Sequence, residues 1–366
     1  MNILLYTSFN ERSIAIESIL LYFKKTGNNV FLLTTCSKGA IHTEMERSGI
    51  MCFAVENPGS GHLKAIRFLI KFCKKNNIDV VHSHLQLPNF YAVMAKAFIP
   101  SKIITVRHNS DVIHLFGTSK ERRIELIVNT LSPCIVAISD KVKNQLIQQE
   151  SVDQKKVVRI NNGYDFSRYE ELGSVTEYEK LKHAFAEKFL ILSPGRLMAS
   201  KRHHLCIEAM PNLLSIQSNC HLIVIGDGPE EESLNELIEK LSLKAHVTMV
   251  SYKENISDYI KLANVVVQLS ISEASNNSVK EAAYFEKPCI VCRDVGDFSD
   301  YITHGVSGFL VDKNSPKFEY IECMKWLFSN KQNYGGELKR EVLSRFEIAR
   351  IGREYDELHK KIGIGK

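Results

Sequence analysis

Apolar runs bounded by turn residues alternate with amphipathic segments along the chain, and this alternation predicts its architecture. In the first half, the strand-like runs NILLYTS and NVFLLTT flank SIAIESILLYFKKTG, whose apolar positions follow a helical period. The pattern continues through IDVVHSH, KIITVRH and CIVAIS and closes with KVVRINNGYDF. Strands that alternate with helices in this way predict a parallel sheet covered by helices on both faces.

The same pattern starts again in the second half, where we expect strands in KFLILSPGRL, CHLIVIGDGP, HVTMVSY, NVVVQLS, KPCIVCR and SGFLVD. Residues 166–188 are charged with little periodicity, which indicates a linker or an insertion. The fold class is therefore α/β, with two Rossmann-like doubly wound domains, residues 1–165 and 189–345, facing across a cleft. Residues 346–366 contain an amphipathic segment, and we expect a C-terminal helix that packs back on the first domain.

The composition is that of a globular protein, with 44% hydrophobic and 24% charged residues among 366. The apolar runs are too short to span a membrane, and no signal peptide is visible. The nine cysteines are scattered and need no disulfide framework. Cys289 and Cys292 have the spacing of a metal or redox pair, but no second pair follows, which favours a buried strand. We therefore expect a cytoplasmic protein.

The net charge of +5 is distributed unevenly. Residues 1–165 hold 21 Lys and Arg against 13 Asp and Glu, whereas the remainder of the chain is mildly acidic. A basic half suits an anionic lipid surface or a phosphorylated acceptor. Nucleic acid is not expected as a partner, because no zinc-finger, basic-zipper or ribonucleoprotein motif is present. The segment 62–76, HLKAIRFLIKFCKKN, fits either a crossover helix with a solvated basic face or a helix lying on a membrane surface.

Two cations follow the first strand of the second half. In SPGRLMASKRHH, Arg196 and Lys201 could neutralise a diphosphate, and Gly195 allows a close backbone turn; the alternative is an ordinary solvated loop. Gly226 and Gly228 lie after the next strand, but a dinucleotide fingerprint would need a third glycine at Glu231. For VIGDGPEEESL we therefore predict a tight turn and an acidic helix start.

The segment SISEASNNSVKEAAYFEKPCIV contains two glutamates eight positions apart, Glu273 and Glu281. Ser278 and Glu281 match a capping box, which would give Glu281 a purely structural role. A helix that begins near Asn277 or Ser278 would instead offer its first amides to an anion. Glu281 could then accept two hydrogen bonds from a ribose, while Glu273 contacts the group attached to the phosphate.

Histidines cluster near strand ends of the first half. His82 and His84 share one face of a strand, and His108 follows the next strand. Three histidines could hold zinc, but no carboxylate stands at a suitable spacing. One histidine that contacts a sugar or moves a proton is the better functional hypothesis.

Taken together, these segments resemble retaining glycosyltransferases of the GT-B fold, in particular family 4. The likeness covers nearly the whole chain and is strongest from about residue 157 to 312, through INNGYDFSRY, SPGRLMASK, LIVIGDGPEEESL, the two-glutamate segment and GVSGFLVD. Glu273 and Glu281 match the family's Glu-x7-Glu motif, and Arg196 with Lys201 matches its diphosphate-clamping pair. His108 matches the family's active-site histidine.

The resemblance implies transfer of a sugar from a nucleotide-diphosphate donor to an acceptor hydroxyl with retention of anomeric configuration. The acceptor would be a saccharide or a lipid-linked saccharide in surface polysaccharide or glycolipid synthesis, at the inner face of the membrane. The residues expected to act on the donor are His108, Arg196, Lys201, Glu273, Asn276, Asn277, Ser278 and Glu281. No Asp-x-Asp pair is present, so we expect no divalent metal and no cofactor besides the donor.

Some positions depart from the family pattern. TSFNERS lacks the glycine pair often found in the first loop, and Asp297 and Asp300 stand in DVGDFSDYI where the family has a glycine and a glutamate. Lys280 places an unusual charge beside Glu281. Two other function classes stay open. One is a sugar-nucleotide epimerase on the same fold, although the first half of this sequence shows no obvious carboxylate cluster for acid–base chemistry at the sugar. The other is a non-catalytic binding protein.

Overall fold

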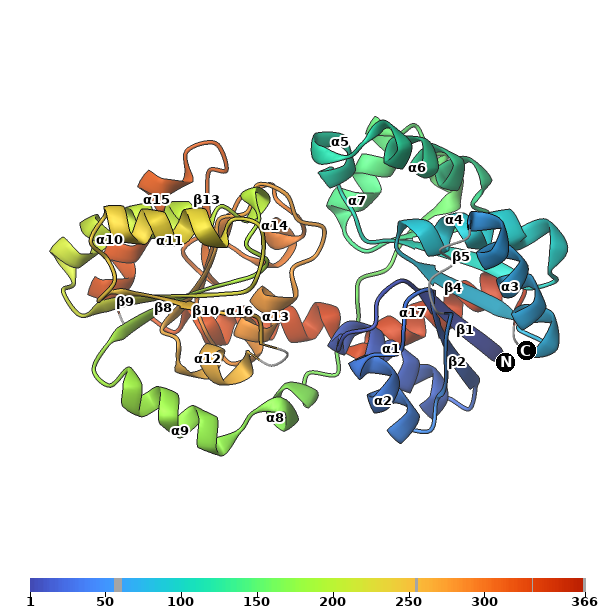
Figure 1. Ribbon diagram of the computed structural model, residues 1–366, viewed down its shortest axis with the longest axis horizontal. Helices are drawn as coiled ribbons and strands as arrows, with labels where there is room; N and C mark the ends of the chain where they lie inside the picture. The colour runs from blue at the N-terminus through green and yellow to red at the C-terminus, as the bar shows by residue number, and fades with distance from the viewer. Residues whose placement is uncertain (56–60, 254–255, 331, 365–366) are drawn as a thin grey trace. The chain divides into compact units, whose positions relative to one another are not determined.

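The computed structural model describes residues 1–55, 61–253, 256–330 and 332–364. It divides into two compact units (Figure 1). Unit 1 comprises residues 1–165 and 346–366, and unit 2 comprises residues 166–345. In both units, parallel strands alternate with helices, as the sequence predicted.

The sheet of unit 1 has the strand order β3-β2-β1-β4-β5-β6-β7, and every pair of neighbours is parallel. Its strands are β1 (Asn2–Thr7), β2 (Asn29–Thr34), β3 (Met51–Ala54), β4 (Val80–His84), β5 (Lys102–Arg107), β6 (Ile135–Ala137) and β7 (Val157–Arg159). The central strands are buried along almost their whole length, which explains their continuous runs of branched apolar residues.

The helices of unit 1 are α1 (Ile14–Lys25), α2 (Ala40–Arg47), α3 (His62–Lys75), α4 (Gln86–Ala95), α5 (Val112–Phe116), α6 (Ser119–Leu131), α7 (Asp140–Asn144) and α17 (Ile348–Lys361). The C-terminal α17 lies against α1, where the Tyr22 hydroxyl donates a 2.8 Å hydrogen bond to Asp356. Gly352 permits this contact, since a Cβ there would come within 2.3 Å of the Tyr22 ring. The last helix thus belongs to the same unit as the first strand.

The sheet of unit 2 has the order β10-β9-β8-β11-β12-β13, again with parallel neighbours. Its strands are β8 (Phe189–Pro194), β9 (Cys220–Ile225), β10 (Val247–Val250), β11 (Val265–Gln268), β12 (Cys289–Cys292) and β13 (Phe309–Val311). The strand order reverses between β8 and β11, which are neighbours in the sheet. In doubly wound folds, ligands bind beyond the carboxyl ends of the strands at such a point.

The helices of unit 2 are α8 (Arg168–Leu172), α9 (Val175–Ala184), α10 (His203–Ile216), α11 (Glu231–Lys240), α12 (Ser257–Leu262), α13 (Asn277–Tyr284), α14 (Phe298–Tyr301), α15 (Pro316–Ser329) and α16 (Tyr334–Phe346, whose last residue falls in unit 1). Residues 166–188, expected as a linker or insertion, contain α8 and α9, and both helices contact α12. They therefore belong to unit 2 rather than joining two bodies as an irregular segment.

The structure bears on two of the sequence alternatives at the level of the fold, and for segment 62–76 it settles how the inner face packs without excluding membrane contact by the outer face. Cys289 and Cys292 are buried free thiols in β12, which confirms the buried strand. Helix α3 is a crossover helix, because Leu69 and Phe72 pack in the core while its lysines face outward.

The loops after β8 and β9 approach each other so closely that only glycine fits. Gly226 has φ +151°, and a Cβ there would stand 1.9 Å from the carbonyl oxygen of Gly195. We expect Gly226→Ala to destabilise unit 2 by about 3 kcal/mol or more, because the backbone must move. Urea denaturation would measure this cost.

Gly305→Ala is the matched control. Gly305 also has a positive φ, +74°, but no atom lies within 4 Å of the place that a Cβ would take, so a loss of only about 1 kcal/mol is expected. Equal losses in the two variants would contradict the close contact.

Candidate functional site

The cations and the acidic motif predicted from the sequence follow two neighbouring strands of unit 2. The loop 195–202 leaves β8, and the loop 269–276 leaves β11. A backbone hydrogen bond of 2.9 Å from Ile271 to Ser200 ties the two loops together. The predicted residues therefore meet at the point where the strand order reverses.

The Glu273 carboxylate is the centre of this cluster. Its Oε1 accepts hydrogen bonds from Lys201 Nζ at 2.5 Å, from Ser270 Oγ at 2.8 Å and from the Asn276 amide at 3.0 Å. The Lys201 and Glu273 side chains are 18% and 10% exposed, so a ligand can reach a pair that is largely withdrawn from water. A charge-assisted contact in such surroundings is stronger than one on the open surface.

Helix α13 begins at Asn277, as the sequence predicted. Its N-cap is Asn276, whose side-chain oxygen accepts a 3.0 Å hydrogen bond from the amide of Val279. Asn276 thus caps the helix with one side-chain atom and binds Glu273 with the other. The first amides of the helix, at Asn277 and Ser278, lie at its positive end, where an anion is favoured.

The capping box predicted as an alternative for Ser278 and Glu281 is wrong. The Glu281 carboxylate accepts a 2.6 Å hydrogen bond from Ser257 of α12 instead of bonding back to Ser278. Glu281 is buried in this position, and burial raises its pKa from 4.5 to about 7, although the Ser257 hydrogen bond and Lys261 act in the opposite direction. The carboxylate of Glu281 therefore does not cap the start of α13.

Arg196 is exposed, and its side chain makes no hydrogen bond or ion pair within the described part of the chain. Its backbone carbonyl instead contacts the buried His203 ring at 3.2 Å. The loop is further held by Arg202, which has φ +55° and hydrogen-bonds the carbonyls of Leu269 and Lys313 at 2.6 and 2.7 Å. Lys201 therefore contacts Glu273 directly, whereas the Arg196 side chain makes no polar contact within the described residues.

In unit 1, His108 pairs with His84, whose Nδ1 lies 2.8 Å from His108 Nε2. Burial lowers the pKa of His108 to about 4, so the ring is neutral at physiological pH; its Nε2 lies against His84, and its Nδ1 has no hydrogen-bond partner among the described residues. His82 points to a different neighbour, since its Nε2 lies 2.7 Å from Nε2 of His359 on α17. The three histidines are therefore divided between two separate hydrogen-bonded pairs, the second completed by His359, and do not converge as a zinc site would require.

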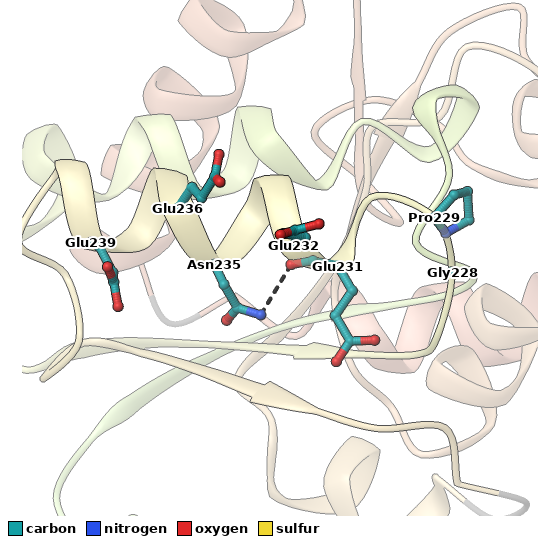
Figure 2. A pocket seen from close by; sticks show the side chains of 7 residues that line it. All are labelled: Gly228, Pro229, Glu231, Glu232, Asn235, Glu236 and Glu239. Carbon is teal, nitrogen blue, oxygen red and sulfur yellow. Dashed lines mark hydrogen bonds between the residues drawn. The ribbon is translucent and has the colours of Figure 1, made fainter.

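A hollow in the surface of unit 2 lies beside α11 and is lined by four glutamates (Figure 2). Gly228 and Pro229 border it, and the helix begins with Glu231 and Glu232. This confirms the tight turn and the acidic helix start predicted from the sequence. Carboxylates repel a diphosphate, so the hollow is not a candidate for the donor site.

Two serines in the site were not identified from the sequence. Ser270 binds Glu273, and Ser257 binds Glu281. A single serine in a loop or at a helix start is too common to signal a role, and both partners depend on how strands and helices come together.

Two kinds of feature are absent from the described residues. No three His, Cys, Asp or Glu side chains there gather as metal ligands would. No helix there combines the length and the apolar character needed to cross a bilayer.

Comparison with known families matched both units. A model described as "Glycosyltransferase Family 4" matches residues 14–168, and a model described as "Glycosyl transferases group 1" matches residues 175–341. The matched segments carry most of the sheet of unit 1 and the candidate site of unit 2.

Curated relatives and a solved structure agree with these matches. The N-acetyl-alpha-D-glucosaminyl L-malate synthase of Bacillus anthracis is 21% identical over 80% of this chain and 77% of its own length. The UDP-Gal:alpha-D-GlcNAc-diphosphoundecaprenol alpha-1,3-galactosyltransferase of Escherichia coli is 23% identical over 69% and 67%. Anabaena HepE, solved with UDP-glucose, superposes with a TM-score of 0.85 at 19% identity over 99% of this chain and 100% of that chain, which confirms the predicted GT-B fold.

The raised pKa of Glu281 leads to a prediction about stability. Between pH 4.5 and 7 the folded state keeps a proton on Glu281 that the unfolded chain has released, so raising the pH through this range destabilises the fold. Glu281→Gln keeps an acceptor for Ser257 and cannot ionise. We expect the variant to gain stability over the wild type as the pH rises from 5 to 8, by at most about 3 kcal/mol.

Denaturant titrations at several pH values would measure this difference. Glu232→Gln, on the exposed start of α11, is the control and should leave the pH dependence unchanged. Parallel curves for Glu281→Gln and the wild type would show that Glu281 ionises as an ordinary carboxylate.

Proposed function

The chain belongs to the glycosyltransferases of group 1 and family 4, and on this premise we propose that it transfers a sugar from a nucleoside-diphosphate donor with retention of anomeric configuration. One observation carries the proposal: Lys201, Glu273 and the start of α13 form one connected cluster at the carboxyl end of the sheet of unit 2. The cluster combines a cation and helix amides, which suit a phosphate, with a carboxylate, which suits sugar hydroxyls.

Each residue of the cluster has a proposed role toward the donor. Lys201 and the amides of Asn277 and Ser278 stabilise the departing diphosphate, and the unengaged Arg196 adds a second cation. Glu273 accepts hydrogen bonds from the donor sugar. These groups are oriented before the substrate binds, because Ser270 and the Asn276 side chain already fix Glu273.

The ribose is assigned to Glu281. Ser257 occupies one of its oxygens, and the other has no hydrogen-bond partner within the described residues. A ribose diol would bind the ionised form, so donor binding and deprotonation of Glu281 are coupled. His108 of unit 1 is neutral, so its proposed role toward a sugar is that of a hydrogen-bonding group rather than of a charge.

Metal independence is part of the proposal. The chain lacks an Asp-x-Asp pair, and fixed cations with a helix terminus can supply the leaving-group stabilisation that a divalent ion gives elsewhere. We assign no protein general base, because the leaving phosphate can take the proton of the acceptor hydroxyl.

The donor and acceptor classes come from the relatives. HepE is solved with UDP-glucose, and the Escherichia coli relative acts on a diphosphoundecaprenol-linked sugar. We therefore propose a UDP-sugar as donor and a saccharide or lipid-linked saccharide as acceptor, in surface polysaccharide or glycolipid synthesis.

Lys201→Ala tests the donor site. We expect kcat for donor hydrolysis or transfer to fall about 100-fold, because a charge that faces the leaving diphosphate is lost. A panel of UDP-, GDP- and ADP-sugars, with release of nucleoside diphosphate as the signal, would measure it. Lys317→Ala removes an exposed lysine of the same unit, 46% accessible, and should not change turnover.

Two outcomes would contradict the assignment. Full activity of Lys201→Ala would remove Lys201 from the site. Formation of an altered sugar that stays attached to its nucleotide would favour the epimerase.

A membrane surface is the proposed partner of unit 1. Helix α4 contacts both α3 and α6, and neither α3 nor α4 contains an acidic residue. The exposed apolar side chains on these helices and the turn after α4 are Leu63, Phe68, Leu87, Met94, Phe98, Leu126, Ile127 and Leu131. Five lysines and arginines accompany them on α3 alone. Exposed apolar side chains among basic residues suit the headgroup region of an anionic bilayer, where the proposed lipid-linked acceptor would reside.

Charge reversal on α3 tests this surface. We expect Lys71→Glu with Lys74→Glu to weaken binding to phosphatidylserine vesicles at least about tenfold, since each basic residue near such a surface contributes about 1 kcal/mol. Vesicle co-sedimentation at low and high salt would measure it. Lys240→Glu with Lys244→Glu makes the same charge change in unit 2 and should bind as the wild type does; equal loss in both variants, or no binding by the wild type, would remove the surface.

A further inference from the structure

Two charges that depart from the family pattern, Lys280 and Asp297, form an ion pair in the interior of unit 2. Lys280 Nζ lies 2.7 Å from Asp297 Oδ2, and both side chains are completely buried. The two residues come from α13 and from the turn before α14. Removing two charges from water is costly, and apolar residues of similar size often give equal or greater stability. Stability alone therefore does not account for this pair.

The lysine also holds the loop that carries the site. Its ammonium donates hydrogen bonds to Ser275 Oγ at 2.9 Å and to the carbonyl of Asn276 at 3.2 Å. The Ser275 hydroxyl in turn donates to Asp297 Oδ2 at 2.7 Å. An apolar side chain at position 280 could make none of these bonds. The ion pair thus ties the N-cap of α13 to the loop between β12 and α14, which carries Asp297.

A second contact joins the same loop to Glu273. Gly296, next to Asp297, has φ +57°, and a Cβ there would come within 2.8 Å of Glu273 Cβ. The turn that carries Asp297 therefore packs directly against the residue at the centre of the site. Asn276, held by Lys280 through its carbonyl, binds the Glu273 carboxylate with its side chain.

Direct contact of Lys280 with a donor is incompatible with its surroundings. The side chain has no exposed area, and its three protons have acceptors at Ser275, Asn276 and Asp297. The Tyr301 ring lies 5.1 Å from its ammonium. The lysine can influence a reaction only through the residues it holds.

We propose that Lys280 and Asp297 are a pair of positioning residues that fix Glu273, Asn276 and the first amides of α13 for transfer of the donor sugar. This inference rests on the proposed function and deepens it. A displacement of reacting groups by about 1 Å can cost about 100-fold in rate, so a device that holds this loop affects kcat more than donor binding.

The test replaces the pair by apolar residues of similar size, as Lys280→Met with Asp297→Leu. Each single change leaves one buried charge without its partner and should lower Tm strongly, whereas the double variant should recover most of the loss. At this recovered Tm we expect kcat to be 10- to 100-fold below wild type, with KM for the donor within about threefold. The backbone amide of Val279, which the Asn276 side chain caps, should exchange hydrogen at least about tenfold faster.

Two further variants accompany the test. Ser275→Ala keeps the ion pair and removes its hydroxyl link to the loop, so it remains informative if the double variant does not fold; a smaller fall in kcat at unchanged Tm is expected. Lys317→Met with Glu208→Met removes an exposed ion pair of the same unit and should change none of these measurements.

The outcomes separate the two proposals. A double variant with wild-type kcat, or with wild-type exchange of the Val279 amide, overturns the positioning role. Absence of turnover by the wild-type protein with every sugar nucleotide instead contradicts the proposed function, and amide exchange then decides the positioning role alone.

Discussion

A single carboxylate oxygen, Oε1 of Glu273, connects the parts of the candidate site. It accepts hydrogen bonds from Lys201 in the loop after β8, and from Ser270 and Asn276 at the two ends of the loop that joins β11 to α13. Two loops far apart in sequence are thereby held in one arrangement before any ligand binds. Such preorganisation lowers the reorganisation required when charge develops on a departing phosphate.

The charged side chains around the candidate site of unit 2 differ in how deeply they are buried. Lys280 and Asp297 are paired out of contact with water, Lys201 and Glu273 are paired where a ligand can reach them, and Arg196 is exposed. Of these five charged residues, the last three are the ones that a ligand can contact. The buried Glu281 carries an electrostatic cost at neutral pH that an uncharged residue would avoid, which is the pattern expected when a carboxylate is kept for binding rather than for stability.

Unit 1 differs in its chemistry. Its outward-facing helices α3 and α4 expose apolar side chains without any acidic residue, and α3 adds basic ones, while the interior contains hydrogen-bonded histidine pairs that burial keeps neutral. Burial lowers the pKa of both His84 and His108, so each can serve only as a neutral donor or acceptor near neutral pH. The basic residues of α3 thus lie on its outward face, whereas the histidine pairs lie in the interior.

The sequence by itself determined the elements and which candidate residues follow strand ends. Apolar runs bounded by turn residues and the helical period are local, and with the local motifs they predicted both parallel sheets, the start of α13 and the buried strand that contains Cys289 and Cys292. The motifs placed Lys201 and Glu273 after strands, but only the sheet order made those strands, β8 and β11, neighbours. The tertiary structure alone decided which side chains meet: Ser257 with Glu281, His84 with His108, and Lys280 with Asp297. These pairs join segments on different elements, and their partners depend on strand order and helix packing, which local periodicity does not encode. For the same reason, the capping box that was one of the two alternatives for Ser278 and Glu281 is wrong: the local pattern allowed it, but Glu281 accepts a buried hydrogen bond from Ser257 of another helix.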